Sequence, residues 1–352
     1  MNSVLSTYLS QARDAGMSLQ QAVTALCAVG WTIESVIAGI LPAPAADTSS
    51  VIHVLGLVKR YGDTTAVDGI SFEVRRGEVF GILGPNGAGK TTTLEMIEGL
   101  RRPTEGAITV NGIDVLTRPH DVKAVIGVQP QSSVFFDGLT LKETLELFAS
   151  LYGRSVDAID LLAQVQLTEK ANQEVKALSG GQKQRFSIAV GLVNDPVVLF
   201  LDEPTTGLDP QARRNLWELV RQINGRGTTV VLTTHYMDEA EVLCDRIAVM
   251  DHARIVALDT TENLLATHGG SPSIEFRSAS AVPTDVLGRL AGVTSVQHED
   301  GVHALITTDT KHTMDQLFVA GRTYGFGIDE LTLKRATLED VFLNLTGHQL
   351  RE

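Results

Sequence analysis

The sequence predicts an α/β fold built on a parallel β-sheet. Three short apolar runs, at residues 79–83, 197–201 and 229–233, alternate with stretches in which apolar residues recur at helical spacing. Consecutive residues of each run are apolar, so we expect strands that are buried on both faces. With 352 residues, of which 43% are hydrophobic and 20% charged, the chain has room for two or three globular domains.

The first 50 residues are set apart by their pattern. Residues 1–41 predict three short helices, because Ser18 and Gln21 match a capping box and Gly16 and Gly30 stand where helices end. This segment is either a small packing domain or an amphipathic segment on a membrane surface. Residues 42–50 are rich in Pro, Ala and Ser and predict a linker.

The remaining residues predict a large domain followed by a small one. Residues 51–270 carry the alternating pattern, interrupted at about 135–195 by a wholly helical stretch in which Thr140 and Glu143 form a capping box. We interpret this stretch as a helical subdomain inserted between strands. Residues 271–352 predict strand, helix, strand, strand, helix and strand, with a last helix at 337–345, and therefore a small α+β domain.

Composition disfavours several classes of protein. No stretch has the roughly 18 uninterrupted apolar residues of a membrane span, and we expect no signal peptide. The net charge of −13 disfavours nucleic acid as a partner, because nucleic-acid binders need a basic face. Cys27 and Cys244 lack metal-ligand spacing and are expected to be buried thiols.

A phosphate-binding loop follows the first apolar run. Residues 84–91 match the pattern G-x-x-x-x-G-K-[ST], with a predicted strand before them and a predicted helix, at about 89–98, after them. Glycines let the backbone N–H groups face phosphate oxygens, and the helix N-terminus adds partial positive charge. We expect Lys90 to reach the β- and γ-phosphates and Thr91 to ligate Mg²⁺. The predicted ATP cradle consists of Gly84, Pro85, Asn86, Gly87, Ala88, Gly89, Lys90, Thr91 and Thr92.

Two acidic residues, Asp202 and Glu203, end the second apolar run. A buried parallel strand delivers such residues to the carboxyl edge of the sheet, beside the phosphate loop. We expect Asp202 to hold Mg²⁺, directly or through water, and Glu203 to be the general base for the attacking water. Asp202 and Pro204 alone could simply end the strand, but the phosphate loop favours the chemical interpretation.

A second anion-binding pattern lies ahead of the acidic strand. Ser179 is expected to cap a helix whose glycine-rich start allows a phosphate to approach the backbone closely. A capped helix without a ligand would look the same if it stood alone. The residues of this pattern are Ser179, Gly180, Gly181 and Gln182, preceded by Leu178.

Over residues 51–270 the chain resembles the ATP-binding cassette (ABC) ATPases. That family carries the phosphate loop, the glycine-rich helix start and the acidic strand end along the chain in the same order as here. His235 follows the third apolar run, at the family's switch-histidine position, and Asp209 ends the run Thr-Gly-Leu-Asp at the D-loop position. Gln131 stands at the Q-loop position; Gln129 is a competitor that the spacing to the following helix disfavours. Tyr61 matches the aromatic residue that stacks on adenine.

The resemblance implies a P-loop NTPase cassette of the ABC type that hydrolyses ATP. Two chains would face head to tail, with each ATP between the phosphate loop of one chain and residues 179–182, with Asp209, of the other. Glu203, His235 and Gln131 would be the catalytic residues. Thr91, Gln131 and Asp202 would hold Mg²⁺.

Further details resemble the daunorubicin-exporter type of bacterial transporter, namely residues 91–100, 234–241 and 338–347. Such chains pair with a second ATPase subunit, here expected to be an identical copy, and with a separate membrane permease. They export drugs, lipids or polysaccharides from the cytoplasmic face of the cell membrane. The permease is expected to insert a short helix into a groove at about residues 132–152.

Two departures and two rivals remain. Thr206 replaces the usual serine of the D-loop and keeps its hydroxyl group. Ala253 stands in a hairpin where the family often has glycine. Because alanine has a Cβ, a positive φ would be costly there.

A soluble, non-transport ABC ATPase of DNA repair or translation usually has two cassettes or a long coiled coil, unlike this chain. A switch that does not hydrolyse ATP is disfavoured because Lys90, Glu203 and His235 are all present.

Overall fold

The computed structural model describes residues 50–299 and 301–348. The three helices predicted within residues 1–41, and all but the last residue of the predicted linker, lie outside this part. Ser50, which the sequence analysis placed in the linker, is the first residue of strand β1 (Ser50–Tyr61). None of the helices in the described part is both long and apolar enough to cross a lipid bilayer.

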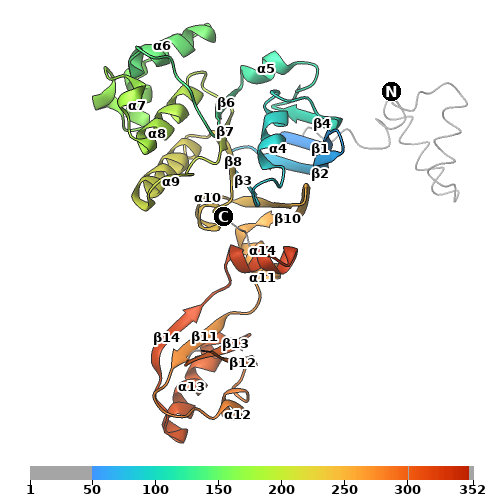
Figure 1. The fold of residues 1–352 in the computed structure, drawn as a ribbon, viewed down its shortest axis with the longest axis vertical. Coiled ribbons are helices and arrows are strands. Elements are labelled where there is room, and N and C mark those ends of the chain that lie inside the picture. The colour runs from blue at the N-terminus through green and yellow to red at the C-terminus, as the bar shows by residue number, and fades with distance from the viewer. Residues whose placement is uncertain (1–49, 300, 349–352) are drawn as a thin grey trace, which may run out of the picture. The chain divides into compact units, whose positions relative to one another are not determined.

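A six-stranded sheet forms the centre of the large domain (Figure 1). Its strand order is β10-β9-β3-β8-β7-β6, and every neighbouring pair is parallel except the edge pair β10–β9. The predicted parallel sheet is therefore confirmed, and the three apolar runs become β3 (Val79–Leu83), β7 (Val198–Asp202) and β8 (Thr229–Thr234). The other strands are β6 (Ile126–Gln129), β9 (Arg246–Asp251) and β10 (Arg254–Thr260).

Each face of this sheet has its own hydrophobic core. In β3, Val79 and Leu83 belong to one core, whereas Phe80 and Ile82 belong to the other. This alternation follows from the two-residue period of a strand. Burying each such side chain stabilises the fold by about 1.5–3 kcal/mol.

An antiparallel sheet, which the sequence analysis did not predict, covers one face. Its order is β2-β1-β4-β5, with β2 (Thr64–Arg75), β4 (Glu105–Val110) and β5 (Ile113–Asp114). Phe72 of β2 stacks on Phe80 of β3 with ring centroids 5.4 Å apart, which joins the two sheets. Helices α4 (Lys90–Ile97) and α5 (Pro119–Lys123) also add side chains, Leu94 and Val122 among them, to this core.

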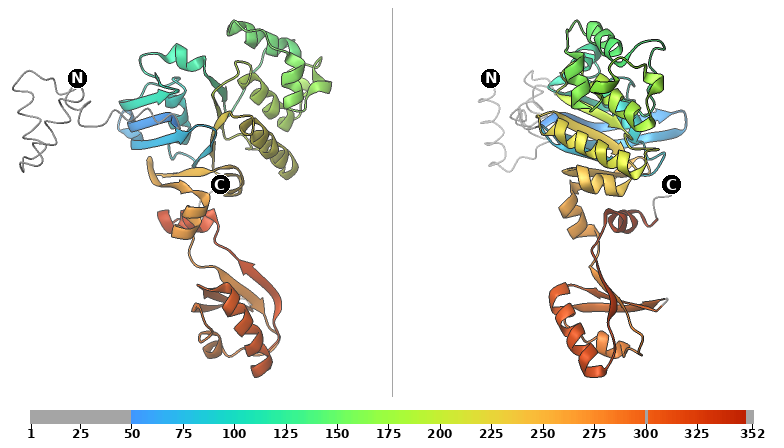
Figure 2. Two further views of the ribbon diagram at one scale, coloured as in Figure 1. Left: turned by 180° about the vertical axis from the view of Figure 1, so that it is seen from behind. Right: turned by 90° about the vertical axis from the view of Figure 1, so that its left-hand side faces the viewer.

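The predicted helical stretch lies on one side of the central sheet (Figures 1 and 2). It contains α6 (Leu141–Leu151), α7 (Ala158–Gln164) and α8 (Gly180–Gly191), with 3-10 turns at Thr168–Lys170 and Val175–Ala177. The predicted capping box of Thr140 and Glu143 is present at the start of α6. Helices α9 (Pro210–Asn224) and α10 (Met237–Leu243) follow β7 and β8 in the chain.

The C-terminal elements have the predicted order. They are β11 (Ser273–Arg277), α12 (Thr284–Leu287), β12 (Val293–Glu299), β13 (Val302–Thr307), α13 (Thr310–Tyr324), β14 (Asp329–Lys334) and α14 (Leu338–Thr346). The strands form an antiparallel sheet in the order β12-β13-β11-β14, with a small core of its own.

The last helix, α14, does not pack on that small core. Its buried residues Leu338, Val341 and Phe342 belong to the helix-covered core of the cassette, beside α10 and α11 (Thr261–His268). The sequence alone places this helix in the C-terminal domain, because an amphipathic pattern predicts a helix without identifying the core that it joins. The chain thus leaves the cassette after α11 and returns to it with α14.

The β9–β10 hairpin turn also differs from expectation. His252 has φ +44° and Ala253 has φ +66°, so two residues with a Cβ adopt the left-handed region. The turn therefore has the conformation that the sequence analysis considered costly for Ala253.

Candidate nucleotide site

The phosphate loop connects β3 to α4 and depends on two glycines. A Cβ at Gly84 would collide with the carbonyl oxygen of Met250. Gly89 has φ +102°, and a Cβ there would collide with the carbonyl oxygen of Ala66. These glycines let the loop pass close to neighbouring backbone and turn directly into the N-terminus of α4, where backbone N–H groups are available to an anion.

Lys90 is buried at the start of α4, with 4% of its surface exposed. Its Nζ donates to the carbonyl oxygens of Gly84 (2.9 Å) and Pro85 (3.2 Å), and lies 3.2 Å from Oε1 of Glu203. Burial lowers the pKa of Lys90, and the charge of Glu203 opposes that effect. The ammonium group is thus held inside the loop by carbonyl groups and a carboxylate.

Asp202 lies at the carboxyl end of β7, next to the phosphate loop. Its Oδ1 accepts hydrogen bonds from the hydroxyl groups of Thr91 (3.2 Å) and Thr233 (2.5 Å). Burial raises the pKa of Asp202, and these two hydrogen bonds act in the opposite direction. Asp202 and Thr91 are both predicted metal ligands, whereas Thr233 is not a predicted site residue, because its only signal is a hydroxyl residue at the end of a buried strand.

Glu203 has a strained backbone, with φ +46°. Its N–H group donates to the carbonyl oxygen (3.2 Å) and the hydroxyl group (3.0 Å) of Thr233, which holds this conformation in place. Residues held in sparsely populated backbone regions cluster at active sites. The strain directs the Glu203 carboxylate toward the groups described next.

Three polar groups surround Oε2 of Glu203. The amide of Gln131 and the hydroxyl of Thr206 donate to it at 3.3 Å each, and Nδ1 of His235 lies 3.4 Å away. Burial raises the pKa of Glu203, but Lys90 and His235 outweigh that effect and leave the pKa below its ordinary value. Glu203 is therefore ionised and able to accept a proton.

The structure separates the two candidate glutamines. Gln129 is buried and donates to the carbonyl oxygen of Pro130 (2.8 Å) and to Oε1 of Gln184 in α8 (3.1 Å). Gln131 reaches Glu203, so the structure brings Gln131, and not Gln129, to the site.

Residues 179–182 lie elsewhere, in a hollow of about 360 Å³. Ser179 caps α8 in a capping box with Gln182, as predicted. Asp209 lines the same hollow and caps α9 by accepting hydrogen bonds from the N–H groups of Gln211 (3.0 Å) and Ala212 (2.9 Å). Among the described residues, none that lines this hollow belongs to the phosphate loop, so one chain does not bring the two anion-binding patterns together.

Comparisons with known proteins identify the family to which this chain belongs. The family model described as "ABC transporter" matches residues 67–206. The chain is 38% identical to the Nod factor export ATP-binding protein I of Ralstonia nicotianae, over 88% of this chain and 98% of that protein. This chain belongs to the ABC transporter ATP-binding proteins.

Two further comparisons agree with this assignment. The chain is 40% identical to the daunorubicin resistance ATP-binding protein DrrA3 of Streptomyces coeruleorubidus, over 87% of this chain and 98% of that protein. A dimeric structure of a bacterial ABC transporter cassette matches 59% of this chain and 98% of its own, with 28% identity and a TM-score of 0.55. The chain is thus an ATP-binding subunit of an ABC transporter, and cassettes of this family hydrolyse ATP to drive transport.

Tyr61 lies at the end of β1 in this ABC cassette, and 42% of its surface is exposed. The Nζ of Lys59 lies 5.0 Å, and the guanidinium of Arg101 5.5 Å, from the centroid of its ring. Arg101 also forms an ion pair with Glu95 of α4. These contacts link the predicted adenine-stacking residue to the helix that follows the phosphate loop.

Two buried carboxyl groups next to the cassette site were missed by the sequence analysis. Glu239 in α10 is fully buried and accepts a hydrogen bond from Nε1 of Trp217 (3.2 Å). Glu98 follows α4, and burial, together with the charges of Asp202 and Glu95, raises its pKa to about 8. The only signal for either was an acidic residue among apolar helical positions.

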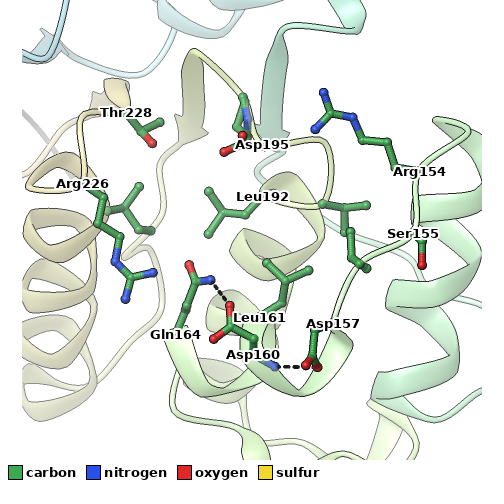
Figure 3. A pocket seen from close by; sticks show the side chains of 14 residues that line it. Arg154, Ser155, Asp157, Asp160, Leu161, Gln164, Leu192, Asp195, Arg226 and Thr228 are labelled. Atoms are coloured by element: carbon green, nitrogen blue, oxygen red, sulfur yellow. Dashed lines mark hydrogen bonds between the residues drawn. The ribbon is translucent and has the colours of Figure 1, made fainter.

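A pocket of about 630 Å³ lies apart from this site (Figure 3). It is lined by residues of the loop before α7, of α7 itself, of the segment that follows α8, and of the end of α9 and the segment after it, including Arg154 and Arg226. Among the described residues, none of those lining it belongs to a predicted nucleotide motif. The pocket therefore marks the junction between the helical subdomain and α9.

Proposed function

We propose that this chain is the ATP-hydrolysing subunit of an exporter and works as a head-to-tail homodimer that encloses two ATP molecules. The observation that carries this proposal is the separation of the two anion-binding patterns. Lys90 and its neighbours lie in the phosphate loop, whereas Ser179 lies in its own hollow with Asp209. A second copy, rotated head to tail, supplies the missing half of each site, so ATP favours the associated state.

The donor set at the phosphate loop suits Mg²⁺. Asp202 and Thr91 offer a carboxylate and a hydroxyl oxygen within hydrogen-bonding distance of each other, and Gln131, whose amide nitrogen contacts Glu203, would add its amide oxygen. Mg²⁺ prefers such oxygen ligands together with substrate phosphates and water. When bound, the ion neutralises charge on the phosphate oxygens.

Glu203 is placed to act as the general base. Its carboxylate is ionised, and the same oxygen atom faces Gln131 and His235. Withdrawing a proton from water as the water attacks the γ-phosphate requires such a positioned carboxylate. His235 orients Glu203, and we assign to it a contact with the γ-phosphate. Ser179 of the second copy donates its helix N-terminus to the same phosphate.

A groove beside the site fits a helix of a membrane permease. It has a volume of about 210 Å³ and lies between residues 133–138 and the 3-10 turn Val175–Ala177. Val134 is 94% exposed and Phe136 is 61% exposed on this segment, which begins two residues after Gln131. Exposed apolar side chains next to a catalytic glutamine provide a route by which permease movement reaches the nucleotide.

The permease would hold the chain at the cytoplasmic face of the cell membrane. The names of the two relatives, one for Nod factor export and one for daunorubicin resistance, favour a drug, lipid or polysaccharide as the exported substrate.

This function is tested by co-expressing the chain with a candidate permease, such as any polytopic membrane protein that a neighbouring gene encodes, and separating membranes from cytosol. We expect the wild type in the membrane fraction. The double variant Val134→Ser/Phe136→Ser should be released with its ATP affinity intact. Val319→Ser, which alters an exposed apolar residue of α13, is the matched control. Wild-type chain that stays in the cytosol, or that binds nucleic acid tightly at physiological salt, would favour a soluble, non-transport ABC ATPase instead.

A further inference from the structure

Three potential metal ligands meet where the returning chain reaches the cassette. Asp251 ends β9, His252 begins the hairpin turn, and His348 follows α14. One ligand atom from each lies within 4.8 Å of the others. In the described part of the chain, no other three His, Cys, Asp or Glu side chains come together in this way.

The two imidazole rings face the same carboxylate oxygen. Oδ2 of Asp251 lies 3.2 Å from Nε2 of His348 and 3.7 Å from Nε2 of His252. Two ligand atoms bound to one tetrahedral Zn²⁺ at about 2.0–2.1 Å lie about 3.3–3.4 Å apart. The two separations from Asp251 approach this value and the two histidine nitrogens lie within 4.8 Å of each other, so side-chain rotations can complete the geometry.

The backbone on both sides holds these rings in place. The left-handed φ of +44° at His252 directs this residue out of the turn. His348 follows Gly347, which has φ +77° at the end of α14, and the hydroxyl of Thr346 donates to the carbonyl oxygen of His348 at 3.0 Å. The ring of Phe342, itself in the cassette core, contacts the ring of His348 edge-on at 5.7 Å between centroids.

We propose that Asp251, His252 and His348 bind one divalent transition-metal ion, with Zn²⁺ as the best match. Two imidazole nitrogens and one carboxylate oxygen are ligands that Zn²⁺ accepts, and the fourth position is open to water because both histidines reach the surface. Softer metals such as Cu(I) favour thiolate or thioether ligands, which are absent from this group.

The role of this metal site is structural. The ion joins residue 348 to the turn at residues 251–252 and so closes a loop of nearly 100 residues that includes the whole C-terminal sheet. Binding that requires both ends of this loop stabilises the folded chain and keeps α14 docked on the cassette. This site is separate from the nucleotide site and does not depend on the proposed transport function.

The test uses full-length, metal-stripped protein without affinity-tag histidines. Zn²⁺ is titrated in the presence of excess Mg²⁺, with a chromophoric chelator as competitor, and the bound metal is counted by elemental analysis. Co²⁺ then replaces Zn²⁺, so that its visible absorption reports the coordination geometry. We expect one Zn²⁺ per chain, a tetrahedral Co²⁺ spectrum and a higher melting temperature with Zn²⁺.

Variants decide whether the ion occupies this place. His252→Ala and His348→Ala alter exposed side chains and should fold, yet bind Zn²⁺ at least about tenfold more weakly, because each removes one of three protein ligands. His312→Ala is the matched control. Nδ1 of His312 in α13 lies 2.8 Å from Oδ2 of Asp309, so this pair resembles the proposed site but lacks its second histidine. It should bind Zn²⁺ like the wild type. Equal Zn²⁺ uptake by the wild type and the His252→Ala/His348→Ala double variant, or no uptake by the wild type, would overturn the proposal.

Discussion

Lys90 and Glu203 form a buried ion pair, with Nζ 3.2 Å from Oε1 and both side chains less than one-tenth exposed. The pair joins the phosphate loop to the end of β7. In the proposed function, the γ-phosphate would compete with Glu203 for the same ammonium group, so nucleotide binding would free the carboxylate to act on water.

Lys90→Ala should weaken ATP binding by about 10- to 100-fold, because a hydrogen bond to a charged group contributes about 1.5–3 kcal/mol. Isothermal titration with ATP measures this loss. Lys142→Ala, which removes an exposed lysine paired with Glu146, should leave the affinity unchanged. Equal affinities for all three proteins would mean that the phosphate cradle is assigned to the wrong residues.

Glu203→Gln should lower ATP turnover by about 10²- to 10⁴-fold while preserving ATP binding, because the amide keeps the shape of the side chain but cannot accept the proton. The variant should therefore accumulate as an ATP-bound dimer, which light scattering after size-exclusion chromatography measures. Adding Ser179→Arg should block dimerisation, because it fills the hollow beside Asp209. A Glu203→Gln chain that stays monomeric with ATP at high protein concentration contradicts the sandwich.

Glu98→Gln should change how stability depends on pH. The pKa of Glu98 rises from its ordinary 4.5 to about 8 in the folded chain. Below pH 4.5 both states are protonated. As the pH rises from 4.5 to 8, the unfolded chain loses this proton first, so the free energy of unfolding falls.

Because glutamine cannot lose that proton, Glu98→Gln should be more stable than the wild type above pH 8, by a few kcal/mol at about 1.4 kcal/mol per pKa unit, and nearly equal to it near pH 4.5. Urea denaturation at several pH values measures the difference. Glu146→Gln, on an exposed helix surface, should show no such trend. A constant difference between Glu98→Gln and wild type at all pH values would refute the buried, protonated carboxyl group.

Elements that depend on local sequence could be predicted, whereas elements that depend on distant partners could not. Strand β3 was predicted with the observed bounds, and the capping boxes fixed the starts of α6 and α8. The pairing of β1 with β4 could not be predicted, because it matches Ile52 to Val110 across nearly 60 residues. Strands β1 and β4 expose many polar side chains, so neither of these two strands carries the continuous apolar run of a central strand.

The same distinction applies to the site. Lys90, Asp202 and Glu203 were identified because their motifs are contiguous in the sequence, and the structure brings them together. Thr233 was missed because its role depends on the alignment of β8 with β7, where Asp202 pairs with Thr233. The position of Ser179 relative to ATP cannot follow from one chain, because its hollow and the phosphate loop do not meet within it.

The strained hairpin between β9 and β10 makes a last prediction about stability. Ala253 has φ +66°, and its carbonyl oxygen accepts a hydrogen bond from the N–H group of Asp68 at 2.9 Å, which ties the turn to β2. Glycine adopts this conformation without the Cβ penalty, so Ala253→Gly should raise the free energy of unfolding by about 1 kcal/mol.

Thermal and urea unfolding measure this gain. Ala257→Gly in β10, where φ is not positive, is the control and should lower stability by about 0.5–1 kcal/mol, because glycine gains unfolded-state entropy there and loses the methyl group that packs on the core. Opposite signs for two identical substitutions four residues apart are what the left-handed backbone at residue 253 predicts. If both variants were destabilised equally, the turn would not hold Ala253 in the left-handed region.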